Sequence, residues 1–159
     1  MMAVPSAPVL VERALLLGRG ETPDAQRIEE LVVFQRQGHR VLLVAPRPRS
    51  WRPTRRNVDL DLALQQQFHQ LFSRAGGELD GVLYVETGLF SRRDAQKSEF
   101  GGIARRYGRK TEELTLMCSD STLIEAAQHA GVRRCVVGPA PDADTPACDS
   151  LKAALSTVK

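Results

Sequence analysis

The feature of this sequence that most restricts its fold is a regular alternation of short apolar runs with longer stretches of helical periodicity. The apolar runs predict buried strands at residues 14–17, 40–45, 81–85, 114–118 and 133–137. The periodic stretches predict amphipathic helices at residues 25–37, 59–75, 98–107 and 122–130, each followed by a glycine. Uniformly apolar strands that alternate with amphipathic helices are typical of a parallel sheet covered on both faces. We therefore expect a three-layer α/β/α, Rossmann-like fold with right-handed crossovers.

The length of the chain suits a single domain. With 159 residues, 42% of them hydrophobic, the chain can bury one sizeable core and is short for two. We expect a flexible lead-in at residues 1–10, which contain two prolines, and one domain over residues 11–159. Residues 139–149 are rich in Pro and Asp and predict a loop before a short terminal helix at residues 150–157.

Composition argues against several classes of protein. No apolar run approaches the roughly 20 residues of a membrane span, and the first residues lack a secretory pattern, so we expect a cytoplasmic protein without a membrane partner. Cys118, Cys135 and Cys148 have no metal-ligand spacing and would leave one thiol over in a disulfide framework, which favours reduced cysteines. The net charge of +3 is small, so local patches matter more than the total.

The stretch ALLLGRGETPD, residues 14–24, is the place where a ligand site is expected. It is interpreted as a buried strand, a glycine-containing turn and then a helix whose N-cap comes from the Thr22-Pro23-Asp24 corner. In open parallel sheets ligands bind at the carboxyl ends of the strands. Phosphoryl transfer there would need a carboxylate, and the positions leaving the predicted strand are Gly18, Arg19 and Gly20.

Three further segments support a resemblance to a known family. They are LDGVLYVETG at residues 79–88, AQKSEFGGIARRYG at residues 95–108 and MCSDSTLIEAAQHAGV at residues 117–132. With the order of elements, they make the chain resemble the haloacid dehalogenase (HAD) superfamily, in the branch of histidinol phosphatases and heptose-bisphosphate phosphatases, over roughly residues 13–138. The resemblance implies the HAD fold without a large cap domain.

The resemblance also assigns positions to the family's catalytic motifs. The first motif, D-x-D-G-T, supplies the nucleophile and the general acid, and GRGET places Gly18 and Gly20 at those two positions. The second motif ends in Thr or Ser, where this chain offers Ala45. The third motif is a lysine, matched by Lys97, and the fourth is an acidic run, matched by Asp120. The family's zinc loop needs Cys and His, and residues 86–96 contain neither, so no zinc site is expected.

These assignments predict a catalytically inactive pseudophosphatase that acts as a binding or assembly module. Lys97 and Asp120 would be vestigial, paired with each other or holding an ion, and no cofactor is expected. The alternative is an active, Mg²⁺-dependent phosphatase for a small phosphorylated metabolite, such as a sugar phosphate or a histidinol-phosphate-like compound, with Asp120 as a metal ligand. A third possibility is a structural subunit that binds no ligand.

An arginine-rich loop follows the second predicted strand and has no acid in it. Arginine grips phosphates and an indole stacks on bases, so the loop and the first turn suggest an anion site for an unknown protein partner or single-stranded nucleic acid. The candidate residues are Arg19, Thr22, Arg47, Arg49, Trp51 and Arg52. The competing interpretation is a solvated Arg and Pro loop with Trp51 packed over the next helix.

Overall fold

Six parallel strands form one sheet in the computed structural model, which describes residues 7–47, 55–79, 81–86 and 93–158. The strands are β1 (Val9–Glu12), β2 (Val41–Arg47), β3 (Val82–Glu86), β4 (Thr115–Cys118), β5 (Arg133–Val137) and β6 (Ala147–Cys148). The helices are α1 (Ala25–Arg36), α2 (Arg55–Arg74), α3 (Arg93–Arg106), α4 (Ser121–Ala130) and α5 (Leu151–Ser156). Short 3₁₀ turns are η1 (Arg13–Leu16), η2 (Arg19–Glu21) and η3 (Thr111–Glu113).

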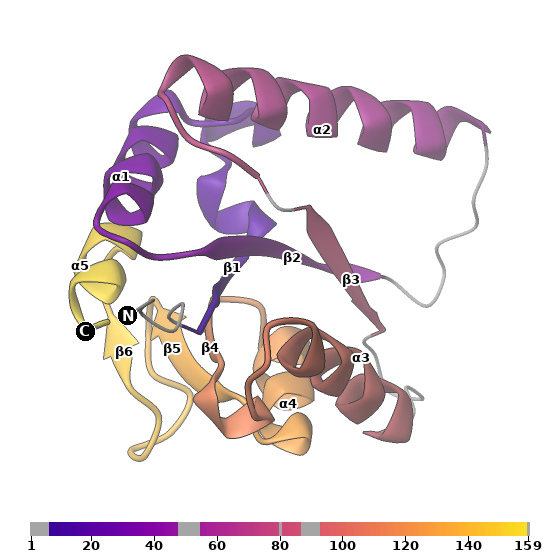
Figure 1. The fold of residues 1–159 in the computed structure, drawn as a ribbon, viewed down its shortest axis with the longest axis vertical. Coiled ribbons are helices and arrows are strands. Elements are labelled where there is room, and N and C mark those ends of the chain that lie inside the picture. The colour runs from indigo at the N-terminus through magenta and orange to yellow at the C-terminus, as the bar shows by residue number, and fades with distance from the viewer. Residues whose placement is uncertain (1–6, 48–54, 80, 87–92, 159) are drawn as a thin grey trace.

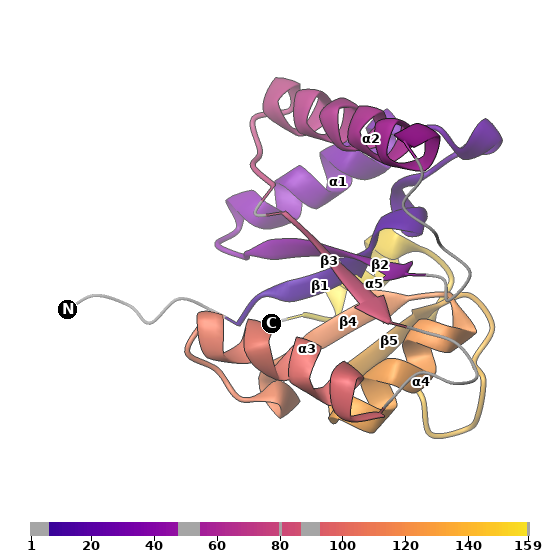
Figure 2. The same ribbon diagram turned by 90° about the vertical axis from the view of Figure 1, so that its right-hand side faces the viewer.

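Helices cover both faces of the sheet, as the sequence predicts. α1, α2 and α5 lie on one face, and α3 and α4 lie on the other (Figures 1 and 2). Each face has its own core of buried side chains, with Phe68 and Phe72 of α2 in the first and Phe100 of α3 in the second. The three-layer α/β/α fold is therefore confirmed, because apolar residues on both sides of every central strand need a helical layer to bury them.

The strand order reverses at the centre of the sheet. The order is β3-β2-β1-β4-β5-β6, so the chain moves outward from β1 in one direction and then returns to build on its other side. β1 and β4 pair in parallel, with Val11 opposite Met117, which brings their carboxyl ends together. In open α/β sheets the crevice at such a reversal is the usual place for a ligand.

The first strand differs from the sequence prediction. Residues 14–17 do not form a strand; most of them lie in η1, and β1 is the preceding segment Val9–Glu12. Val9 and Leu10, which were expected in a flexible lead-in, are 3% and 0% exposed. The run of leucines is buried, since Leu15 and Leu16 join the first core, but a short apolar run does not distinguish a buried strand from a buried helical turn.

The GRGET segment forms a hairpin-like loop that projects from the start of α1. Gly18 N–H donates to Thr22 O at 2.7 Å, and Leu17 and Pro23 form an isolated antiparallel bridge. Gly20 and Glu21 both have positive φ, 71° and 56°, at the tip of the turn. These contacts close a loop, residues 17–23, whose first and last residues lie side by side.

The remaining elements agree with the predictions except at a few boundaries. α2 and α3 begin earlier than expected, and the loop predicted at residues 139–149 contains β6. Cys118 and Cys135 are buried, as expected, and the Cys135 and Cys148 sulfurs lie 3.8 Å apart as free thiols. No helix in the described parts of the chain is both long and apolar enough to cross a membrane.

Two glycines allow a matched test of the backbone. Gly131 ends α4 with φ 79°, and Gly101 lies inside α3; a Cβ built at either position meets nothing within 4 Å. Gly131→Ala should therefore lower the free energy of unfolding by about 1 kcal/mol through left-handed strain alone. Gly101→Ala should raise it by about 0.5–1 kcal/mol through helix propensity. Urea denaturation measures both, and changes of the same sign would contradict the assigned conformations.

Candidate functional site

The carboxylate of Glu12 lies at the strand-order reversal. Glu12 is the last residue of β1 and is 2% exposed. Its Oε1 accepts hydrogen bonds from the backbone N–H of Ser119 at 3.1 Å and of Asp120 at 2.9 Å, and its Oε2 accepts from the Ser119 hydroxyl at 3.4 Å. The side chain thereby joins the end of β1 to the turn that follows β4.

Burial dominates the ionisation of this group. Desolvation raises the pKa of Glu12 above its ordinary value of 4.5, although the backbone hydrogen bonds from Asp120 and Ser119 act in the opposite direction. The nearby Asp120 carboxylate raises it further. Burial raises the pKa of the neighbouring Cys118 thiol to about 12.

Asp120 is the N-cap of α4. Its Oδ1 accepts from the backbone N–H groups of Thr122 at 2.8 Å and Leu123 at 3.2 Å, and also from the Thr122 hydroxyl. An aspartate in this position satisfies N–H groups that have no partner inside the helix. One of the two carboxylate oxygens of Asp120, Oδ1, is thus engaged by the first turn of α4.

A second polar group links the carboxyl side of β1 to α2. Arg13 Nη1 donates to Asp61 Oδ1 at 3.0 Å and to the Tyr84 hydroxyl at 3.2 Å, and the Tyr84 hydroxyl donates to the other oxygen of Asp61. The pKa of Tyr84 is raised, first by burial and then by its hydrogen bond to Asp61. Sequence reasoning missed these three residues, because they come from η1, α2 and β3 and share no motif.

A polar cavity of about 610 Å³ opens beside the same edge. Its lining includes Ala14, Asp24 and Arg27 from the start of α1 and η1, together with Ser119 and Asp149. Arg27 is occupied there, since its Nη1 donates to the carbonyls of Leu15 at 3.0 Å and Leu17 at 2.8 Å. Glu12 is not part of the lining, so the cavity does not expose that carboxylate.

Only some of the predicted site residues gather at this edge. Asp120 follows β4 at its carboxyl end. Ala45 is buried one position beyond Val44, which pairs with Glu12, but β2 continues to Arg47, so Ala45 lies two residues before the end of its strand. Lys97 is exposed on α3 instead, and the described residues contain no ion pair between Lys97 and Asp120, so the expected salt bridge is wrong.

The predicted anion site is only partly described. Arg19 and Thr22 are exposed in the loop of residues 17–23, where the Thr22 hydroxyl donates to Arg19 O at 3.1 Å. Arg49, Trp51 and Arg52 lie outside the described residues, and only the backbone of Arg47 is described. The interpretation of this segment as an anion site therefore stays a prediction.

Solved structures that share this fold include phosphatases. A D,D-heptose 1,7-bisphosphate phosphatase from B. bronchiseptica, complexed with magnesium and phosphate, matches with TM-score 0.70 and 15% identity, over 94% of this chain and 97% of that one. The Burkholderia thailandensis enzyme matches with TM-score 0.57 and 16% identity, over 96% and 97%. The core domain of a putative phosphoglycolate phosphatase from Streptococcus pneumoniae matches with TM-score 0.52 and 10% identity, over 96% and 93%.

The chain thus has the fold of the HAD phosphatases, which confirms the resemblance at the level of the fold. No family model and no curated protein sequence matches it.

The position of β1 corrects the alignment of the first motif. That motif was expected directly after a strand at residues 14–17, whereas the first strand ends at Glu12, six residues before Gly18. The expectation that Gly18 and Gly20 replace the two acids is therefore wrong. Glu12 closes β1 and Ala14 follows two residues later, so the end of the first strand carries a carboxylate at one of these positions and a methyl group at the other.

The carboxylates at this edge offer few free oxygens to a magnesium ion. Mg²⁺ requires several oxygen ligands in near-octahedral geometry. In the described ranges no three His, Cys, Asp or Glu side chains form a group that could hold a metal. Oε1 of Glu12 and Oδ1 of Asp120 accept from backbone N–H groups, and Oε2 of Glu12 accepts from the Ser119 hydroxyl, so few of their lone pairs are left for a cation.

Substitution of Glu12 separates its role as an acceptor from its charge. Glu12→Gln keeps an oxygen for the N–H groups of Ser119 and Asp120, whereas Glu12→Ala removes it. We expect Glu12→Ala to lower the free energy of unfolding by about 1–3 kcal/mol, because it leaves those donors without their partner. Glu12→Gln should remain within about 1 kcal/mol of the wild type. Equal losses in urea denaturation would contradict this role.

The pH dependence of stability should reveal the raised pKa of Glu12. A raised pKa means that the folded state favours the protonated carboxyl; this contribution is fully present below pH 4.5 and is lost as pH rises through the raised value. Glu12→Gln cannot ionise, so its free energy of unfolding should gain on that of the wild type as pH rises above 4.5. A difference that stays constant across parallel urea titrations would be evidence against burial of the charge.

Proposed function

We propose that this chain is a phosphatase-fold protein without phosphomonoesterase activity, retained as a binding or assembly module. The observation that supports the proposal most directly is Glu12. A carboxylate that attacks phosphorus must present a free oxygen to the substrate. Here the oxygens of Glu12 accept three hydrogen bonds from one residue pair, Ser119 and Asp120, in a side chain that is 2% exposed.

The other parts of the reaction are also missing from the described site. Ala14 has a methyl group where a general acid would stand, and Ala45 has a methyl group where a hydroxyl would bind the phosphoryl group. Lys97 is exposed on α3, and Asp120 caps α4. Loss of several members of a catalytic unit leaves essentially no turnover, because removal of a single member already costs orders of magnitude.

A binding role is favoured over that of a purely structural subunit by the distribution of apolar surface. Exposed large hydrophobic side chains in the described chain are Val33 on α1 and Leu60 and Leu62 on α2. Leu60 and Leu62 are two positions apart, which points them to different sides of the helix. They do not form the contiguous apolar patch that a permanent partner would require.

The alternative function is an active phosphatase for a small phosphorylated metabolite. It draws its support from Glu12 itself, which keeps a carboxylate at the end of β1. Activity through this residue would require the turn at Ser119 to move away and release the oxygens of Glu12. Magnesium would be the cofactor expected of such an enzyme.

A phosphatase assay distinguishes the two functions. Purified protein with p-nitrophenyl phosphate, or with a sugar phosphate, and Mg²⁺ should give no turnover above that of Glu12→Gln, which keeps the fold and removes the only carboxylate available at the position of the nucleophile. Turnover that Glu12→Gln abolishes while Glu29→Gln, an exposed carboxylate on α1, retains it would establish the active phosphatase instead.

A further inference from the structure

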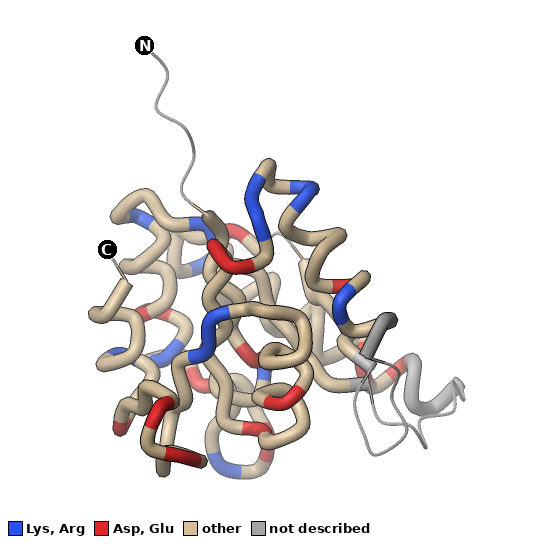
Figure 3. The backbone as a smooth tube through the Cα atoms, turned by 90° about the horizontal axis from the view of Figure 1, so that it is seen from below, with Lys and Arg blue, Asp and Glu red and all other residues tan. Residues whose placement is uncertain are grey.

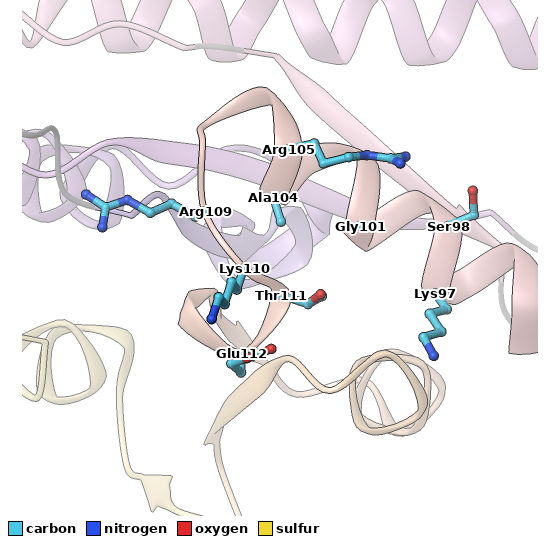
Figure 4. Close-up of a pocket in the computed structure, with 9 residues that line it drawn as sticks. All are labelled: Lys97, Ser98, Gly101, Ala104, Arg105, Arg109, Lys110, Thr111 and Glu112. Atoms are coloured by element: carbon cyan, nitrogen blue, oxygen red, sulfur yellow. The ribbon is translucent and has the colours of Figure 1, made fainter.

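Charge does not single out a ligand site among the described residues. Charged residues of both signs are interspersed along the described backbone (Figure 3). In the hollow of about 580 Å³ between α3 and η3, the side chains of Lys97, Arg105 and Arg109 point in different directions and do not converge on one point (Figure 4). A specific contact between two reactive side chains occurs instead at the edge of the sheet, between Cys135 and Cys148.

The thiols of Cys135 in β5 and Cys148 in β6 face each other, with their sulfurs 3.8 Å apart. β5 and β6 pair in parallel with Val137 opposite Cys148. Cys135 lies two residues before Val137 and therefore points to the same face of the sheet. Both cysteines pack with the core on the face that α1, α2 and α5 cover. A disulfide has a sulfur–sulfur bond of about 2.05 Å, so closure requires the two sulfurs to approach by about 1.8 Å.

β6 is an edge strand that can supply this movement. It has two residues and stands last in the strand order, so its one neighbour in the described sheet is β5 (Figure 1). The loop that precedes it, residues 139–146, is exposed apart from Thr145. A segment with few buried contacts shifts at a lower cost in free energy than a central strand does.

The two thiols differ in exposure and in ionisation. Cys135 is 5% exposed, whereas Cys148 is only partly buried. Burial, and then the hydrogen bond to Cys148, raises the pKa of Cys135 to about 11, which disfavours its thiolate at neutral pH. Because the thiolate is the nucleophile in disulfide exchange, the first reaction with an external disulfide falls to Cys148.

We propose that Cys135 and Cys148 are a redox-active pair that closes to a disulfide in the folded chain, with Cys148 reacting first. The oxidant is a small disulfide such as oxidised glutathione. The Cys148 thiolate attacks one of its sulfurs, forms a mixed disulfide and releases one small thiol. Cys135 then attacks Sγ of Cys148 and releases the second small thiol. Two electrons pass from the protein thiols to the small disulfide, and the two thiol protons end on the released thiols.

The disulfide ties the segment after β6 to the sheet. Asp149 and Ser150 follow Cys148 directly and line the polar cavity of about 610 Å³. The Ser150 hydroxyl also caps α5, where it accepts from the N–H of Ala153 at 3.1 Å. Oxidation therefore fixes one wall of the cavity and the start of α5 to β5. The proposal is independent of the proposed loss of phosphatase activity, because it concerns thiols and no carboxylate.

Thiol counting after oxidation tests the pairing. Reduced protein is incubated with oxidised glutathione, quenched in acid, denatured and alkylated, so that each remaining thiol gains one label. Of the three cysteines one should remain reactive, and peptide mapping should join Cys135 to Cys148. The matched control is Cys118→Ala, which removes the buried thiol on the other face of the sheet and should close the same disulfide.

Two single variants test the order of the reaction. Cys135→Ala keeps the partly exposed thiol and should accumulate the mixed disulfide at Cys148. Cys148→Ser leaves only a buried thiol of the pair and should accumulate about 10-fold less adduct at Cys135 in the same time. Circular dichroism of both variants excludes unfolding as the cause of a difference.

Thermal unfolding tests the tether. Closure of a loop of this length constrains the unfolded chain and should raise the Tm of the wild type by about 6–12 °C. Cys148→Ser should have the same Tm with and without oxidised glutathione.

Several outcomes would overturn the proposal. They are no loss of thiols, a mixed disulfide that persists in the wild type, a covalent dimer, a disulfide that includes Cys118, or equal adducts in the two single variants. A Tm that stays constant or falls on oxidation would also overturn it, because the bond would then not tie β6 to β5.

Discussion

The buried carboxylate of Glu12 accepts hydrogen bonds from the N–H groups of Ser119 and Asp120. These bonds stabilise the centre of the fold. They join the carboxyl ends of β1 and β4, the neighbouring strands at which the strand order reverses. These two strands are not consecutive in the chain, so no single connection links them. Because the two N–H groups belong to the turn into α4, the same contact holds Asp120, the residue that caps that helix. Burial of a charge is costly, and two backbone donors offset part of that cost.

The polar groups around this contact serve structure in a similar way. Asp120 satisfies the first turn of α4, and Arg13 joins Asp61 of α2 to Tyr84 of β3. The fold thus matches those of heptose bisphosphate phosphatases at 15–16% identity, although the polar side chains at its carboxyl edge are engaged with the chain itself. A fold and the chemistry placed on it can diverge separately, since strand pairing and core packing tolerate changes that catalysis does not.

The sequence predicts most of the architecture, and its failures have identifiable causes. β5 was predicted at its observed bounds and α4 to within one residue, because an apolar run and a terminal glycine define them. β1 was misplaced because the leucine run after it is equally apolar, and β6 has only two residues. Asp120 was placed at the correct edge, since the end of β4 locates it. Glu12 was missed, although an acid that directly closes a buried strand is a usable signal. The direction in which Lys97 leaves α3 was not predicted, because it depends on packing that periodicity does not determine.

The loop of residues 17–23 is anchored to its surroundings at its base. Arg27 anchors the carbonyls of Leu15 and Leu17, and Asp24 N–H donates to Leu16 O at 2.8 Å, whereas Arg19, Gly20 and Glu21 are exposed. The tip is therefore separated from the core, and substitutions in it should cost little folding stability. A chance similarity between the sequence of such a tip and a catalytic motif can therefore arise easily. Across distant relatives, the strand that precedes a motif is a better guide to ancestry than the residues of the motif alone.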